Sequence, residues 1–226
     1  MRLDILSALN AERAARRPTL IVTEIHNGRQ RLVKGEEVAR DPLTDVLLRH
    51  LRSGKSGMEE TPEGKVFLTV HVPPPRLVIT GAVHISQALA PMARMLNYDV
   101  TIVDPRTAFA SAERFPDLNV IAEWPDTALP PLNIDRYTAF AALTHDPKID
   151  DPSLHLALKS KVFYIGALGS KKNQAARAQR LAGAGFSQAD IARIHGPIGL
   201  NIGAQGAPEI AISVMAEVTR VLRLGN

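Results

Sequence analysis

The fold is decided by residues 76–86, which read RLVITGAVHIS. The run Arg76–Thr80 is short, apolar and rich in β-branched side chains, which is typical of a buried strand. Gly81 follows at once and permits a tight turn, and a helical pattern of apolar residues begins near Ser86. A strand, a glycine turn and a helix in this order indicate the opening unit of a doubly wound parallel sheet.

Strands and helices continue to alternate along the rest of the chain. This alternation predicts an α/β fold, with a Rossmann-like doubly wound parallel sheet over residues 76–226. In such sheets the ligand binds outside the carboxyl ends of the strands. The later strands are expected at Val100–Val103, Val120–Ile121, Ala139–Leu143 and Val162–Ile165, and the helices at Ser86–Leu96, Asp151–Ser160, Ser170–Leu181 and Pro208–Leu222.

Three consecutive prolines at positions 73–75 indicate a domain boundary, because they favour an extended linker and cannot continue a helix or a central strand. The alternative interpretation is a loop inside one domain. Residues 1–72 are expected to form a small α+β domain that precedes the sheet. Its predicted elements are a helix over Ile5–Arg17, strands over Thr19–Ile25, Gln30–Val33 and Lys65–Val72, and a helix from Asp41 through Leu51 with Asp41 as its N-cap.

The composition excludes several classes of function. The 226 residues contain no cysteine, which excludes disulfides and thiolate metal sites and fits a cytoplasmic protein. The formal charge of +4 is spread evenly: residues 1–75 hold 12 basic and 10 acidic side chains, and residues 76–226 hold 15 and 13. This distribution argues against binding to nucleic acid. No apolar run approaches the ~20 residues of a membrane span. His26, His50 and His71 of the N-terminal domain lie far apart and show no metal-ligand spacing.

The first candidate binding residues follow the first two strands of the predicted sheet. Gly81, Ala82 and His84 occupy the position of a dinucleotide glycine loop, although Val83 replaces the second glycine of the G-x-G-x-x-G fingerprint. Asp104 follows the second strand, at a position where a carboxylate commonly accepts hydrogen bonds from ribose hydroxyls. Arg106, two residues later, could hold a phosphate. The alternatives are an ordinary turn at the glycine and an internal Asp–Arg pair.

Two further loops supply candidates at the same edge of the sheet. His145 and Asp146 follow the fourth strand and could bind ligand hydroxyls or phosphates, or could simply form and cap a turn. The fifth strand is followed by a loop with Gly166, Gly169, Ser170 and Lys171. Cations in the first turn of a helix oppose its dipole, so this arrangement favours an anionic ligand. Arg177 and Arg180 are expected to extend this basic face, and the alternative is a solvated basic helix.

Taken together, these motifs resemble the XdhC/CoxI family, the accessory proteins of molybdenum hydroxylases such as xanthine dehydrogenase. The similarity extends over most of residues 66–222 and follows the family order. The segments that carry it are Val103–Arg106, Ala112–Pro116, Leu143–Pro147, Tyr164–Ser170 and Arg193–Gly203. The chain departs from the family pattern at Val83, where a small residue is usual, and at Asn201, where an aspartate is usual. Its N-terminal domain also lacks a Gly-Gly-Cys segment.

The resemblance implies a non-enzymatic accessory protein that binds molybdenum cofactor, assists its sulfuration and transfers it to an apo-enzyme. It also implies contact with a cysteine desulfurase and assembly as a homodimer. The alternative is an NAD(P)-dependent oxidoreductase with a degenerate dinucleotide loop, favoured by the order of strand, Gly81, helix, strand and Asp104. The predicted cofactor-binding set is Gly81, Ala82, His84, Asp104, Arg106, His145, Asp146, Gly166, Gly169, Ser170 and Lys171, with no catalytic and no metal-ligating residue.

Overall fold

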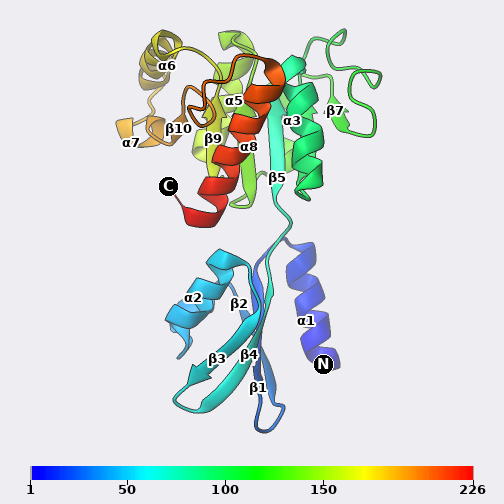
Figure 1. The fold of residues 1–226 in the computed structure, drawn as a ribbon, viewed down its shortest axis with the longest axis vertical. Coiled ribbons are helices and arrows are strands. Elements are labelled where there is room, and N and C mark those ends of the chain that lie inside the picture. The colour runs from blue at the N-terminus through cyan, green and yellow to red at the C-terminus, as the bar shows by residue number, and fades with distance from the viewer. Residues whose placement is uncertain (1, 226) are drawn as a thin grey trace. The chain divides into compact units, whose positions relative to one another are not determined.

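A computed structural model describes residues 2–225. Met1 and Asn226, the outermost residues of the two predicted domains, lie outside the described residues. The chain divides between Pro73 and Pro74 into two compact units, so the division falls within the proline run. Figure 1 shows the course of the chain through both units.

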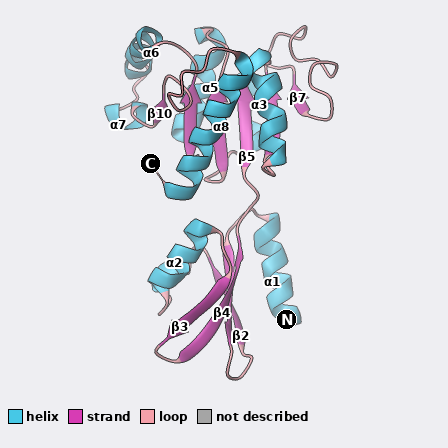
Figure 2. Cartoon of the chain, viewed as in Figure 1, coloured by secondary structure: helices cyan, strands magenta, loops and turns pink. Residues whose placement is uncertain are grey.

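The N-terminal unit is built on a four-stranded antiparallel sheet in the order β2-β1-β4-β3 (Figure 2). One core lies between this sheet and α2, where Leu47 packs with Leu20 and Leu68. A smaller cluster joins α1 to the sheet through Ile5, Leu9 and Ile21. The elements are α1 (Leu3–Ala14), β1 (Thr19–Glu24), β2 (Gln30–Lys34), the 3-10 helix η1 (Val38–Arg40), α2 (Thr44–Ser53), β3 (Gly57–Thr61) and β4 (Gly64–His71).

One prediction for this unit was wrong, and one strand was missed. Asp41 is not a helix N-cap, because α2 begins at Thr44; its carboxylate accepts a hydrogen bond from the Leu43 backbone N–H and pairs with Arg31. The strand β3 was not predicted. Its residues alternate in exposure with few apolar side chains, and its position comes from pairing along β4, with Gly57 opposite Leu68.

The C-terminal unit contains a six-stranded sheet in the order β10-β9-β8-β5-β6-β7, and every neighbouring pair is parallel. In chain order this is the 3-2-1-4-5-6 arrangement of a Rossmann fold, read from β7. The predicted α/β fold is therefore confirmed. The strands are β5 (Arg76–Thr80), β6 (Asp99–Val103), β7 (Asn119–Ile121), β8 (Thr138–Ala142), β9 (Tyr164–Ala167) and β10 (Ile194–His195).

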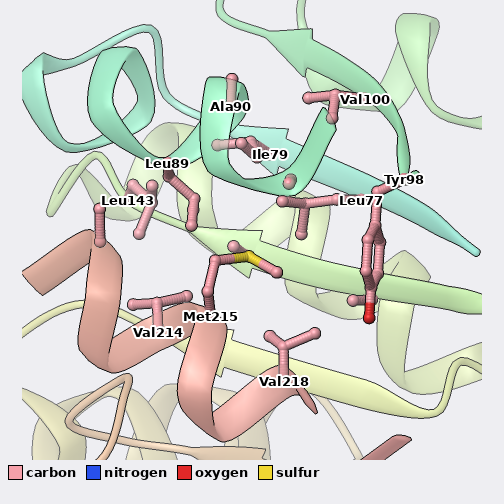
Figure 3. Packing of buried hydrophobic residues seen from close by; sticks show 14 of the residues in the cluster. Leu77, Ile79, Leu89, Ala90, Tyr98, Val100, Leu143, Val214, Met215 and Val218 are labelled. Atoms are coloured by element: carbon pink, nitrogen blue, oxygen red, sulfur yellow. The ribbon is translucent and has the colours of Figure 1, made fainter. Parts of the chain in front are cut away.

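Helices cover both faces of this sheet. On one face α3 and α8 pack against each other and against the sheet, with α3 next to β6 and α8 next to β9, and Leu89 and Met215 belong to the same buried cluster as Leu77 (Figure 3). On the other face Leu154 and Leu181 pack against Val78 and Phe140. The helices are α3 (His84–Met95), α4 (Pro125–Ala128), the 3-10 helix η2 (Pro130–Leu132), α5 (Pro147–Lys159), α6 (Lys171–Gly183), α7 (Gln188–Ile191) and α8 (Ala207–Leu224).

The turn from β5 into α3 lies at the point where the strand order reverses. Gly81 has a φ of +114°, in the region that favours glycine. A Cβ atom at this position would lie 2.9 Å from Cγ2 of Thr144 and 3.2 Å from the backbone of Leu143. Gly81 therefore allows the first turn of the sheet to pack directly against the turn that follows β8.

We expect Gly81→Ala to lower the free energy of unfolding of the C-terminal unit by about 1–3 kcal/mol, because the added methyl group clashes and the backbone angle becomes strained. Urea unfolding followed by the fluorescence of Trp124, the only tryptophan, measures this unit. Gly183→Ala is the matched control. Gly183 ends α6 with open space around it, so this change should be neutral or stabilising by up to ~1 kcal/mol. Equal effects would contradict the close packing described for this turn.

Candidate functional site

A pocket of about 550 Å³ opens beyond the carboxyl end of β9, as the parallel sheet predicts for a ligand site. One wall comes from the turn after β8 and the loop from β9 into α6, and the second wall comes from the long loop that leads from β10 into α8. The volume lies within the usual range for small-molecule sites. The lining residues are His145, Leu168–Lys171, Pro197–Ala204, Ile210 and Ser213.

The structure brings four of the predicted residues together in this pocket, namely His145, Gly169, Ser170 and Lys171. The other seven do not line it. Four of these are buried: Gly81, Ala82, Asp104 and Gly166. The remaining three, His84, Arg106 and Asp146, are at least partly exposed at other points of the strand-end edge.

The loop from β9 into α6 presents a cationic helix start to the pocket. The Ser170 hydroxyl caps α6 by accepting a hydrogen bond from the Asn173 backbone N–H, and Lys171 is the first helical residue. No acidic residue lies in this first turn. Two positive charges, on Lys171 and Lys172, therefore meet the positive end of the helix dipole with no internal compensation in that turn. An anionic ligand in the pocket would remove this conflict.

The sequence predicted a basic helix face from Lys171 to Arg180, and this prediction was wrong beyond the first turn of α6. Arg177 is buried and points into the protein rather than into solvent. Arg180 forms an ion pair with Asp151 of α5, at 2.5 Å between Nε and Oδ2. Sequence periodicity did not distinguish these positions, because arginine is common on exposed helix faces. The positive charge available to a ligand is thus concentrated at Lys171 and Lys172.

The second wall of the pocket, residues 197–204, was not among the predicted site residues. Its apolar side chains, such as Ile198 and Leu200, give the pocket a surface suited to a flat or apolar part of a ligand. Gly199 has a φ of +91°, and a Cβ there would lie 2.1 Å from the Ser213 hydroxyl. The sequence carried a signal for this wall. Glycine and proline alternate there with apolar residues, and a loop with so many apolar side chains must pack against the rest of the protein or a partner.

One carboxylate on α8 holds this wall in place. Glu217 accepts hydrogen bonds from the Tyr164 hydroxyl at 2.7 Å and from the Gly199 backbone N–H at 2.9 Å, and its other oxygen lies 3.2 Å from Nδ1 of His195. Burial opposes its charge, but the hydrogen bonds from His195, Tyr164 and Gly199 outweigh burial and lower the pKa of Glu217. The site therefore rests on a polar network that ties β9, β10 and α8 together.

Asp104 is part of the scaffold and does not offer its carboxylate to a ligand. It is fully buried and accepts hydrogen bonds from the Arg106 guanidinium at 2.7 and 2.9 Å, and from the Ala82 backbone N–H at 2.8 Å. Burial raises the pKa of this carboxyl, but the bonds from Arg106 and Ala82 more than offset burial and lower it overall. The structure therefore agrees with the alternative interpretation of this motif, an internal ion pair between Asp104 and Arg106.

The glycine turn is also committed to internal contacts. Besides the bond from its N–H to Asp104, Ala82 accepts a hydrogen bond through its carbonyl from Arg114 at 2.9 Å. The Val83 N–H donates to the Ser86 hydroxyl at 2.8 Å. In dinucleotide-binding folds the N–H groups of this turn approach the diphosphate. Their use within the protein argues against that binding mode here.

The turn after β8 places His145 at the pocket in a strained conformation. His145 is exposed and has a φ of +64°, which is uncommon for a residue with a side chain. The Asp146 carboxylate accepts a hydrogen bond from the Lys148 backbone N–H and so caps α5. This cap is the reason that α5 begins at Pro147, four residues before the predicted start at Asp151.

Two other kinds of feature are absent from residues 2–225. The described part of the chain contains no group of three histidine, aspartate or glutamate side chains that could hold a metal ion. None of its helices is long and apolar enough to cross a membrane.

We expect Asp104→Asn to lower the free energy of unfolding by about 2 kcal/mol at neutral pH, because charge-assisted hydrogen bonds in a buried site are lost. The pKa of Asp104 is lower in the folded than in the unfolded chain. Its contribution is therefore complete above about pH 4 and is lost as the pH falls through the folded-state pKa.

Urea unfolding of the wild type and the variant at a series of pH values between 7 and 3 measures this difference. The gap between the two proteins should narrow below about pH 4. Asp126→Asn makes the same charge change on an exposed side chain and should leave the pH dependence of stability unchanged. A gap that stays constant over the whole range would contradict the role assigned to Asp104.

Comparisons with known proteins agree with the geometry. The family description that matches residues 77–218 is the XdhC Rossmann domain. The molybdenum cofactor insertion chaperone PaoD of Escherichia coli (strain K12) is 35% identical over 146 residues, which are 65% of this chain and 40% of PaoD. A protein of Bacillus subtilis (strain 168), named as a probable xanthine dehydrogenase subunit, is 31% identical over 154 residues, 68% of this chain and 44% of that protein.

The chain thus matches less than half the length of each of these two relatives. A crystal structure described as a xanthine dehydrogenase from Bacillus halodurans is 22% identical and has a TM-score of 0.60, covering 97% of this chain and 80% of that one. This similarity concerns the fold. The family match covers all six strands of the parallel sheet except Arg76, and it covers both walls of the pocket. It confirms the resemblance seen in the sequence: the chain belongs to the XdhC family.

Proposed function

We propose that this protein binds molybdenum cofactor and delivers it to a molybdenum hydroxylase such as xanthine dehydrogenase. The observation that carries the proposal is the pocket itself, in which Lys171 and the start of α6 face an apolar wall. The names of the two relatives support it, since one is a cofactor insertion chaperone and the other a probable subunit of a xanthine dehydrogenase. The protein acts as a carrier in this proposal, with the cofactor as its cargo.

The two walls of the pocket suit the two chemically different parts of this cargo. Molybdenum cofactor is a pterin with a phosphate or nucleotide tail. The Ser170 hydroxyl and the Lys171 ammonium group supply a hydrogen bond and a positive charge for the phosphate. The apolar side chains Leu168, Ile198 and Leu200 supply a surface against which a flat ring system can pack.

The absence of cysteine from the chain limits its part in sulfuration. A protein without a thiol cannot carry a persulfide, so the sulfur comes from a partner while this protein holds the cofactor. A cysteine desulfurase is that partner in our proposal, and the carrier works as a homodimer in the cytoplasm. The chain performs no chemical step of its own.

The oxidoreductase alternative has less support from the site. Its two sequence signals were the glycine turn and Asp104, and both are engaged in contacts within the protein. A fluorescence titration with oxidised and reduced nicotinamide cofactors separates the two functions. Low-micromolar binding together with turnover of a substrate would replace the carrier proposal by the oxidoreductase.

The direct test of the cargo is purification of the full chain from a host supplied with molybdate, followed by mass spectrometry of the released small molecules. We expect a pterin with a phosphate or nucleotide tail in about equal amount to the protein. A protein that emerges without any pterin from a host that makes the cofactor in quantity would count against the proposal.

Lys171→Ala should weaken retention of the released cofactor by about tenfold, because one charge-assisted hydrogen bond to its phosphate is lost. Equilibrium ultrafiltration measures the retained fraction. Lys172→Ala is the matched control, since it removes the same charge from the next residue, which does not line the pocket. The control should change retention by less than about twofold. Unchanged retention in Lys171→Ala would remove this lysine from the site.

A further inference from the structure

A buried ion pair lies behind the pocket without lining it. Asp150 of α5 and Arg177 of α6 approach to 3.6 Å between Oδ2 and Nη2, and their side chains are 1% and 6% exposed. No sequence motif singled out Asp150, and Arg177 was expected in solvent. The pair connects α5 and α6. His145 lies in the turn just before α5, Lys171 is the first residue of α6, and both line the same pocket.

On one side the pair holds the loop that leads to Lys171. The Arg177 guanidinium donates to the Leu168 carbonyl at 2.9 Å and to the Gln174 side chain. Gln174 in turn donates to the carbonyls of Ala167 and Gly169, at 2.9 and 3.3 Å. The three carbonyl groups of residues 167–169, just before Ser170, therefore accept hydrogen bonds from side chains of α6, the helix that follows this loop.

On the other side the pair holds the turn that carries His145. The Asp150 oxygen that faces away from Arg177, Oδ1, accepts hydrogen bonds from the Thr144 hydroxyl at 2.6 Å and from the Thr144 N–H at 3.3 Å. The same hydroxyl accepts a hydrogen bond from the Asp146 N–H at 3.1 Å. The residues on both sides of His145 are thus anchored, which maintains its positive φ angle.

The pair is poorly explained as a device for stability. Removing two charges from water costs several kcal/mol per ion, and the Coulomb attraction compensates only when hydrogen bonding is complete. Here Oδ2 of Asp150 and Nε of Arg177 have no hydrogen-bond partner within residues 2–225. Burial raises the pKa of Asp150 despite the Thr144 bond and the nearby Arg177, and it lowers the pKa of Arg177. Two well-packed apolar side chains would cost less.

We propose that Asp150 and Arg177 are positioning residues that lock the turn after β8 to the loop after β9, so that His145 and Lys171 face one pocket. The geometric part of this inference stands on the contacts above. Its consequence for cofactor retention rests on the proposed function. The two parts are therefore tested by different measurements.

Hydrogen exchange in the full chain tests the geometric part without any ligand. Arg177→Met should increase the exchange rates of the Leu168, Thr144 and Asp146 amides at least tenfold, including the two on the far side of the pair. Arg76→Met is the matched control: Arg76 also donates to a carbonyl, that of Leu132, and lies 3.7 Å from an aspartate, at the start of β5. It should leave these three amides unchanged. Equal exchange in both variants would overturn the proposal.

Cofactor retention, measured by equilibrium ultrafiltration with the released cofactor, tests whether the pair acts through Lys171. Arg177→Met should weaken retention about tenfold in the wild-type background but less than about threefold in a Lys171→Ala background, because the positioned group is already absent. Effects that simply multiply would show a general structural role and overturn the proposal. If the wild type retains no cofactor, the proposed function fails while the exchange result still decides the positioning role.

Asp150→Asn provides a second variant that keeps the shape of the side chain and removes its charge. It removes the charge that pairs with Arg177 and leaves only the more distant Asp151 to offset the buried guanidinium, so both loops should loosen, as expected for Arg177→Met. This variant decides the test if Arg177→Met does not fold. Faster exchange at Thr144 alone, with Leu168 unchanged, would show that the two loops are held independently and would overturn the proposal.

Discussion

The parallel pairing of β5 with both β6 and β8 is the constraint on which the C-terminal unit depends. Because β5 lies between the two halves of the sheet, the chain must leave it toward one side and later return to the other. All strand-to-helix turns then lie at one edge. The candidate functional residues therefore collect there even though Gly81 and Lys171 are 90 positions apart in the sequence.

Not all of that edge is available to a ligand. The turn after β5 and the end of β6 are joined by the contacts of Ala82 with Asp104 and Arg114, and Gly81 lets this turn pack against Thr144. The pocket lies instead beyond β9, with its second wall supplied by the loop after β10. The Rossmann arrangement is retained, whereas the place where dinucleotides usually bind is occupied by internal hydrogen bonds.

The sequence was sufficient for five of the six strands and for one of the two walls of the pocket. Periodicity located β5, β6, β8 and β9, and glycine followed by Ser170 and Lys171 marked the cationic helix start. It could not locate β10, whose two residues are too few for any period. It also could not show that Arg177 points inward or that Asp104 is engaged, because both depend on partners brought together only by the folded sheet.

The dependence of the pocket wall on Glu217 has a consequence for the order in which the site is completed. Glu217 lies on α8, while the groups that it holds, Tyr164, His195 and Gly199, are all translated before it. A nascent chain that has emerged only as far as β10 contains all six strands but lacks the carboxylate that secures the wall. The strands of the sheet are therefore synthesised before the carboxylate that secures the pocket wall, and the wall is completed only when α8 packs onto the sheet.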